Sequence, residues 1–259
     1  MTLDIRTVPC LKDNYAYVAH DSATGATAVI DIPEAAPLVA VLKAEGWTLT
    51  HVLITHHHWD HVDGLDDLLA TAPQAESVKI IGAAADKHRL PKLDIAVTEG
   101  DTIQIGAETG HIIDVSGHTM GHIAYHFPAS DAVFTADSLM ALGCGRLFEG
   151  TPERMWDSLS KLKALPQETI VYSGHEYTQS NAKFALTIEP DNPDLISRSR
   201  AVDAARTNGE PTVPSSLALE LATNPFLRAD DPRIAARLGM PDAAASTVFA
   251  EIRSRKDNF

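Results

Sequence analysis

Cysteine is scarce in this chain, which holds only Cys10 and Cys144 among its 259 residues. Two cysteines are too few for the disulfide framework that stabilises small secreted domains, so the fold has to rest on an apolar core. Hydrophobic residues make up 44% of the chain, which is enough for such a core. No Cys-His-Asn pattern accompanies Cys144, so we interpret it as a bystander and not as a catalytic thiol.

Long apolar runs are missing as well. No stretch approaches the roughly 20 apolar residues that a membrane-spanning helix requires. The first six residues carry neither the basic start nor the apolar segment of a targeting signal. We therefore expect a soluble, cytoplasmic protein without a membrane partner.

Basic residues are outnumbered by acidic ones. The chain has 21 Lys and Arg against 35 Asp and Glu, which gives a formal net charge of −14. Such a surface repels a phosphate backbone, so nucleic acid is excluded as a general partner. Part of the carboxylate excess is expected to serve as metal ligands, whose charge a bound divalent cation would offset.

The first two thirds of the chain alternate short β-type runs with helical stretches. Strands are expected at residues 16–19, 27–31, 51–54, 78–81, 102–105, 111–115, 123–127, 132–135 and 169–172. Helices are expected at residues 33–45, 64–71 and 151–165, and further along at residues 176–188, 193–207 and 215–223. This order predicts α/β layers in which helices cover sheets. We place one domain at residues 1–175 and a smaller helical domain at residues 176–259.

Histidine is concentrated in one place. Residues 55–61 read Thr-His-His-His-Trp-Asp-His, directly after the apolar run Val52-Leu53-Ile54. Several imidazoles buried without partners would be costly, whereas neutral imidazoles and a carboxylate are the usual ligands of a divalent cation. The cluster therefore predicts a metal site on a loop that follows a buried strand.

Alternate residues of an extended loop point the same way, so His56 and His58 are expected to reach one cation. Asp60 and His61 follow the turn and are expected to reach a second cation about 3.5–4 Å away, as in two-metal sites. His57 is expected to point away from this pair, and Trp59 to pack around the site.

Further ligands have to come from elsewhere, because one loop cannot surround two ions. His118, Asp137 and His175 each follow a strand-like run, and such strand ends can converge on one edge of a sheet. Asp137 is the natural bridge, since a carboxylate can bind two cations. His122, one helical turn after His118, is a less favoured ligand candidate.

In their order along the chain, these residues resemble the metallo-β-lactamase superfamily, and within it the chain closely resembles the glyoxalase II (hydroxyacylglutathione hydrolase) family. The motifs that carry the resemblance are Asp13-Asn14-Tyr15-Ala16-Tyr17, the His-x-His-x-Asp-His loop at residues 56–61, Gly143-Cys144-Gly145-Arg146, Gly174-His175-Glu176-Tyr177-Thr178, Asn224-Pro225-Phe226-Leu227-Arg228 and Arg253-Ser254-Arg255-Lys256-Asp257-Asn258-Phe259. They extend over essentially the whole chain.

The resemblance implies an αββα sandwich with a helical C-terminal domain and a site for two metal ions. The ligands it implies are His56, His58 and His118 for the first metal, Asp60, His61 and His175 for the second, and Asp137 as the bridge. The glutathione contacts it implies are Arg146, Tyr177, Arg253 and Lys256. Four residues depart from the family pattern: Arg146 stands where Lys is common, Phe148 where Tyr is common, Ala136 where Gly is common, and Asp63 where a small residue is common.

The implied reaction is hydrolysis of S-lactoylglutathione to glutathione and D-lactate, the second step of methylglyoxal detoxification. Two divalent cations lower the pKa of a shared water toward 7, and a thioester is a suitable target because thiolate leaves readily. Asp60 would orient the metal-bridging hydroxide. Zinc is the expected metal, with iron or manganese as alternatives. The expected partner is a small-molecule glutathione thioester, and the expected oligomeric state is a monomer.

Three alternatives stay open at this point. A persulfide dioxygenase of the same superfamily would use one iron held by two His and one Asp, and would take up oxygen. Hydrolysis of a β-lactam or a lactone would leave the basic C-terminal motif without a role. A metal-binding module without turnover would be inert toward every thioester. The range of acyl groups is not decided by the sequence.

Overall fold

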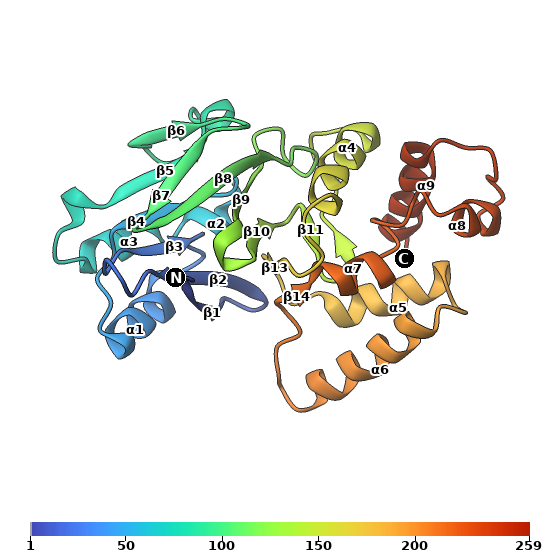
Figure 1. Cartoon of the computed structure of the whole chain (residues 1–259), viewed down its shortest axis with the longest axis horizontal. Helices are drawn as coiled ribbons and strands as arrows, with labels where there is room; N and C mark the ends of the chain where they lie inside the picture. The colour runs from blue at the N-terminus through green and yellow to red at the C-terminus, as the bar shows by residue number, and fades with distance from the viewer. Residues whose placement is uncertain (1) are drawn as a thin grey trace. The chain divides into compact units, whose positions relative to one another are not determined.

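The computed structural model describes residues 2–259 (Figure 1). By its internal contacts the chain divides into two compact units. The first unit comprises Met1–Asp114 and Met120–Thr135, and the second comprises Val115–Thr119 and Ala136–Phe259. Within residues 2–259, none of the helices has the length and apolar character needed to cross a membrane.

The first unit contains a six-stranded sheet in the order β1-β2-β3-β4-β5-β6. Its strands are β1 (Asp4–Cys10), β2 (Asn14–His20), β3 (Thr27–Ile30), β4 (His51–Leu53), β5 (Lys79–Ala83) and β6 (Ile95–Val97). Strands β1 to β3 are antiparallel, whereas β3 to β6 are parallel. Parallel neighbours need crossover connections, and these carry α1 (Ala35–Glu45), α2 (Trp59–Val62), α3 (Leu65–Thr71), η1 (Ala75–Ser77) and η2 (Ala84–Asp86).

Helix α1 covers an apolar core between itself and this sheet. Leu38 and Leu42 of α1 are buried together with Val29 and Val52 of the parallel strands. The helix ends at Gly46, whose φ of +68° lies in the left-handed region that glycine adopts freely.

The first unit also holds four antiparallel strands in the order β10-β9-β8-β7. They are β7 (Thr102–Ile105), β8 (Glu108–Asp114), β9 (Ile123–Phe127) and β10 (Ala132–Ala136), with η3 (Pro128–Ser130) between the last two. The hydroxyl of the buried Tyr125 on β9 donates a hydrogen bond of 2.8 Å to the carbonyl of Ile54, just after β4. This bond ties β9 to the start of the histidine-rich loop.

The second unit is mainly helical. Its helices are α4 (Pro152–Lys163), α5 (Thr178–Ile188), α6 (Pro193–Thr207), α7 (Leu217–Thr223), α8 (Pro232–Arg237) and α9 (Ala245–Asp257). Its short strands form two antiparallel pairs, β11 (Leu139–Met140) with β12 (Gly143–Cys144), and β13 (Ile170–Ser173) with β14 (Ser215–Ser216). Side chains of Thr151, Asn192, Ser216 and Asp231 cap the helices that follow them, which explains where α4, α6, α7 and α8 begin.

The expected alternation of strands and helices is present, but several elements were not predicted, among them β1, β6, β11, β12, β14, α8 and α9. Strand β1 was not predicted, because it alternates polar residues and contains Pro9, a pattern typical of an edge strand. Residues Ser215–Ser216 form β14, where a helix was expected to begin. The second contact-defined unit contains Val115–Thr119 and Ala136–Phe259 and so does not coincide with residues 176–259; the domain boundary at residue 176 stays a prediction.

Replacing Leu38 by Ala tests the contribution of α1 to stability. Leu38 is fully buried, so its removal leaves a cavity, and we expect the free energy of unfolding to fall by about 2–5 kcal/mol. Chemical denaturation followed by circular dichroism measures this change. Leu219→Ala, on a leucine that is 38% exposed, is the matched control and should change stability by no more than about 0.5 kcal/mol. Equal effects of the two substitutions would contradict this account of the core.

Candidate metal centre

The histidine-rich loop lies in the first unit, between β4 and α2. His56 and His61 are fully buried, and His58 and Asp60 are partly buried. The Nε2 atom of His56 lies 3.1 Å from Nδ1 of His58, and Nε2 of His61 lies 3.9 Å from Oδ2 of Asp60. The loop therefore gathers the four predicted ligands of this unit, in the two pairs that their spacing indicated.

Asp31 fixes the orientation of His61. Its Oδ2 accepts hydrogen bonds of 2.8 Å from Nδ1 of His61 and from the hydroxyl of Thr55, and its Oδ1 accepts one of 2.9 Å from the Thr55 amide. A proton on Nδ1 leaves Nε2 of His61 as the atom available to a metal. Asp31, His56 and His61 lie close enough to share an ion, but the three bonds to Asp31 favour an orienting role for it.

Two more side chains hold this loop. Nδ2 of Asn14 donates hydrogen bonds of 3.1 Å to both Oδ2 and the carbonyl of Asp60. Nδ1 of His57 lies 3.1 Å from the buried carboxylate of Asp86, which also accepts bonds from Arg89. The structure thus bonds His57 to Asp86, and the prediction that His57 is not a ligand stays a prediction.

The expectation for Trp59 was wrong: its side chain is 65% exposed and does not pack around the site. His122, the less favoured candidate, is buried, and its ring stacks on that of His56 with centroids 4.6 Å apart. Its Nδ1 lies 3.2 Å from the carbonyl of Ile123, so the structure gives His122 a packing role beside a predicted ligand.

The second unit gathers the other three predicted ligands around one oxygen. Oδ2 of Asp137 lies 3.5 Å from Nε2 of His118 and 3.3 Å from Nε2 of His175. All three residues are buried. Nδ1 of His118 lies 2.8 Å from the carbonyl of Arg146, which directs its Nε2 toward Asp137.

The backbone before Asp137 shows why glycine is common at position 136, where this chain has alanine. Ala136 has a φ of +41°, in the left-handed region that glycine adopts without strain. An alanine there costs roughly 1–2 kcal/mol, so the position is strained next to a predicted bridging ligand.

The predicted glutathione contacts all lie in the second unit, in different environments. The Tyr177 ring stacks on that of His175 with centroids 4.7 Å apart, and the exposed Phe148 ring meets His118 edge-on at 5.2 Å. The Arg146 side chain is 66% exposed, whereas that of Arg253 is only 6% exposed and donates to the Cys144 carbonyl and to Asp257.

Lys256 is half-buried beside these arginines. Its ammonium group lies 5.3 Å from the ring centroids of both Phe184 and Phe259. Burial lowers the pKa of Lys256, and the positive charges of Arg253 and Arg146 lower it further. A negatively charged ligand would relieve this repulsion among three cations.

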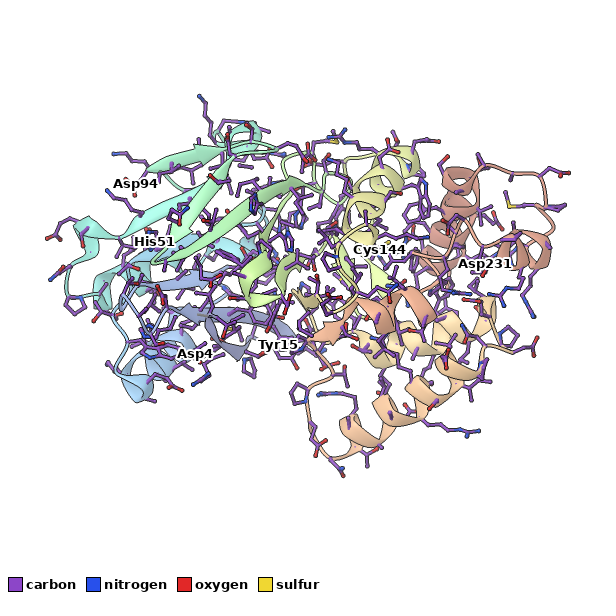
Figure 2. The ribbon with its side chains drawn as sticks, viewed as in Figure 1. Asp4, Tyr15, His51, Asp94, Cys144 and Asp231 are labelled. Carbon is purple, nitrogen blue, oxygen red and sulfur yellow. The ribbon has the colours of Figure 1, made fainter. Side chains whose placement is uncertain are left out.

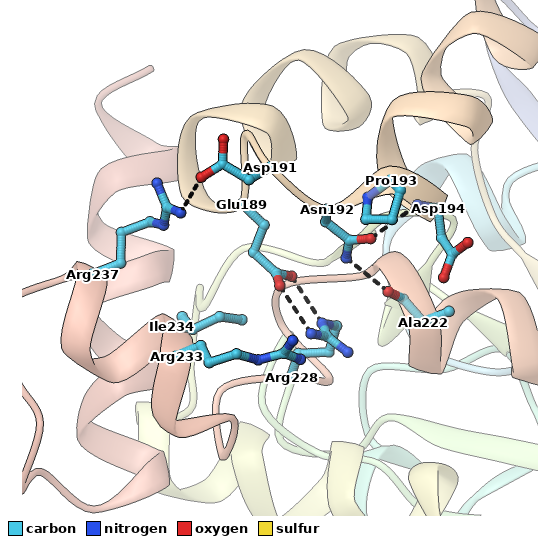
Figure 3. A pocket seen from close by; sticks show the side chains of 10 residues that line it. All are labelled: Glu189, Asp191, Asn192, Pro193, Asp194, Ala222, Arg228, Arg233, Ile234 and Arg237. Atoms are coloured by element: carbon cyan, nitrogen blue, oxygen red, sulfur yellow. Dashed lines mark hydrogen bonds and ion pairs between the residues drawn. The ribbon is translucent and has the colours of Figure 1, made fainter.

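A pocket of about 390 Å³ lies among the helices of this unit, lined by none of the predicted glutathione contacts (Figure 3). Arg228 forms a two-bond ion pair with Glu189 at 2.8 and 2.9 Å, and Arg237 meets Asp191 at 2.6 Å. The cations of this pocket are therefore neutralised by its own carboxylates, whereas Arg146 and Arg253 share the carboxylate of Asp257, at 3.9 and 2.9 Å.

The donor chemistry of both groups of predicted ligands fits divalent metal ions. Neutral imidazoles and carboxylates are the preferred ligands of zinc, iron and manganese, and burial of these polar groups is costly unless something binds them. Cys144, labelled in Figure 2, is not part of either group. The His and Asp clusters are thus suited to hold metal.

Sequence reasoning missed Asp31, Asn14 and Asp86. Asp31 follows the apolar run Ala28-Val29-Ile30, so it carries the same signal, a polar side chain at a strand end, that marked Asp137. Asn14 belongs to a family motif but was given no role. Asp86 follows β5 in a similar way, within η2.

Comparison with known proteins agrees with this geometry. The model of the metallo-beta-lactamase superfamily matches residues 23–175, and that of the hydroxyacylglutathione hydrolase C-terminus matches residues 176–259. A hydroxyacylglutathione hydrolase of Jannaschia sp. (strain CCS1) is 65% identical over 98% of both chains, and one of Ruegeria pomeroyi is 61% identical over 100% of both.

A solved structure supports the fold. The crystal structure of ETHE1 from Myxococcus xanthus is similar to this one with a TM-score of 0.65 and a sequence identity of 25%. The match covers 98% of this chain and 90% of the ETHE1 chain. The expected metallo-β-lactamase fold with a helical C-terminal region is confirmed. The two family models and the full-length relatives agree, and the chain belongs to the hydroxyacylglutathione hydrolases of the metallo-β-lactamase superfamily.

Proposed function

We propose that this protein hydrolyses S-(2-hydroxyacyl)glutathione thioesters, and that S-lactoylglutathione, which yields glutathione and D-lactate, is its substrate. The observation that carries the proposal is identity of 65% over 98% of the chain to a hydroxyacylglutathione hydrolase. The full set of predicted ligands and the basic residues of the second unit support it.

The proposal includes two divalent ions, with zinc as the expected metal. His56, His58 and His118 would hold the first ion, Asp60, His61 and His175 the second, and Asp137 would bridge them. The family relationship supports this assignment, as does the convergence of His118 and His175 on Asp137.

When bound, the two ions lower the pKa of a shared water toward 7 and polarise the thioester carbonyl. Asp60 is expected to orient this water, and Asn14 holds Asp60 through its two hydrogen bonds. Asp31 keeps the proton of His61 on Nδ1.

A cysteine nucleophile is disfavoured by the structure. Burial raises the pKa of Cys144 to about 11 and that of Cys10 to about 12. Both thiols therefore stay protonated at neutral pH, and a protonated thiol is a poor nucleophile.

The glutathione part of the substrate carries two carboxylates, and a protein of net charge −14 repels it at long range. We propose that Arg146, Lys256 and Tyr177 contact it at short range, and that the buried Arg253 adds positive charge behind them. We also propose that the protein is cytoplasmic and monomeric. Cell fractionation would test its location, and light scattering would test its oligomeric state.

Metal removal gives the first test. We expect a chelator to abolish hydrolysis of S-lactoylglutathione and zinc to restore it, with two ions per chain by elemental analysis, because the metals supply the nucleophile. A metal-loaded preparation with a single ion, or one that is inert toward the thioester, would refute the proposal.

Asp31→Asn tests the orientation of His61. The substitution keeps the size of the side chain but replaces one acceptor oxygen by an amide donor, so we expect metal affinity to fall about 10–100-fold. Competition with a chromophoric chelator measures the affinity. Asp21→Asn alters another buried carboxylate of the same unit, which accepts bonds from Thr24 and Ala107, and should leave metal affinity unchanged. A similar loss in both variants would indicate a general effect on folding.

Lys256→Ala tests the anion contact. Loss of a charge-assisted hydrogen bond costs about 1.5–3 kcal/mol, so KM for S-lactoylglutathione should rise about 10-fold or more while kcat changes little. Arg237→Ala removes a cation of the same unit that is paired with Asp191, and should leave KM unchanged. An unaltered KM in Lys256→Ala would exclude Lys256 from the contact.

A further inference from the structure

The hairpin formed by β11 and β12 connects two parts of the predicted metal centre in the second unit. At its start is Asp137, and at its end is Arg146, whose carbonyl accepts the 2.8 Å hydrogen bond from Nδ1 of His118. Gly145 fits closely between them: a Cβ atom there would lie 2.1 Å from the Asp137 carbonyl and 2.8 Å from Nδ1 of His118. A shift of this hairpin would therefore move two predicted ligands.

Side chains of the C-terminal helices and of Asn224, which directly follows α7, bond to the backbone of the hairpin. Four carbonyls and one amide in it bond to four such side chains. Nδ2 of Asn224 donates to the carbonyls of Met140 (3.1 Å) and Gly143 (3.0 Å). Nδ2 of Asn181 donates to the Ala141 carbonyl (3.0 Å), and Nη1 of Arg253 donates to the Cys144 carbonyl (3.0 Å). The Leu142 amide in turn donates to Oε2 of Glu220 (2.9 Å). The backbone conformation of residues 140–144 is thus set residue by residue from α5, α9 and the segment around α7.

Glu220 and Asn224 form the centre of this arrangement, and both are fully buried. The Glu220 carboxylate also accepts from Arg198, from the hydroxyl of Ser215 at 2.5 Å and from Nδ2 of Asn224 at 3.0 Å. A buried charge with every partner in place tolerates few alternative arrangements, because each lost bond leaves an unsatisfied group. Leu142 is held at a φ of +57°, which is unusual for a leucine and fits an externally imposed conformation.

We propose that Asn224, supported by Glu220, is a positioning residue for the metal centre: through the β11–β12 hairpin, the C-terminal helices set the placement of Asp137 and His118. This inference rests on the proposed metal assignment. It gives the helical region a second role beside the binding of glutathione, and it gives Arg253 a part in both.

Asn224→Asp tests the proposal. The aspartate keeps the size of the side chain and the acceptor for the Phe226 amide, but it has no hydrogens for the Met140 and Gly143 carbonyls and brings a second carboxylate toward Glu220. We expect zinc affinity to fall about 10-fold or more, the visible absorption of the cobalt-substituted protein to change, and kcat to fall while KM for S-lactoylglutathione stays within about threefold of that of the unaltered protein.

Asn192→Asp is the matched control. Asn192 caps α6 through Oδ1, which the aspartate retains, and its Nδ2 donates to the Ala222 carbonyl at 3.0 Å, a bond of the same kind outside the hairpin. Its zinc affinity and cobalt spectrum should equal those of the unaltered protein.

If circular dichroism shows that Asn224→Asp does not fold, the variant Asn181→Ala tests the proposal in its place. This variant removes the single bond to the Ala141 carbonyl, and a weaker zinc affinity with an altered cobalt spectrum is expected. A folded Asn224→Asp, or in its place Asn181→Ala, with unaltered zinc affinity and cobalt spectrum would overturn the proposal. Metal binding is measured without substrate, so inactivity of the unaltered protein toward the thioester would refute the proposed function separately.

Discussion

A hydrogen bond at Nδ1 of a buried imidazole is the interaction on which the rest of this structure depends. His61 makes it with the Asp31 carboxylate, and His118 makes it with the Arg146 carbonyl. In each case the bond selects the tautomer and aims Nε2 at the position where a metal is expected. Thr55 on one side, and the bonds to the β11–β12 hairpin on the other, hold these two acceptors in place.

The two units hold their acceptors in different ways. In the first unit the acceptor is a side chain at the end of β3, and it also binds Thr55 at the start of the histidine-rich loop, so strand and loop are fixed together. In the second unit the acceptor is a backbone carbonyl, which depends on the conformation of a short hairpin. That hairpin is in turn fixed by helix side chains, so the ligands of the second unit depend on the C-terminal helices.

The clustering of the proposed ligand residues could be predicted from the sequence because their signal is local: polar side chains at the ends of apolar runs, and His-x-His-x-Asp-His spacing. The general α/β character followed from the same runs. The support of the site could not be predicted in this way. The bonds to the hairpin join residues 40–109 positions apart, and nothing near Asn224 in the sequence indicates that it binds Met140 and Gly143. Arg253 was predicted as a glutathione contact, which stays a prediction, but its burial was not foreseen, because a basic C-terminal motif usually lies in solvent.

The burial of both cysteines has a consequence for a protein whose expected product is glutathione. Mixed disulfides with glutathione form through a thiolate, and they require access for the second sulfur. Cys10 and Cys144 are both buried, and burial keeps the pKa of each thiol far above neutrality. Neither thiol is therefore placed to form a mixed disulfide with the glutathione that the proposed reaction would release.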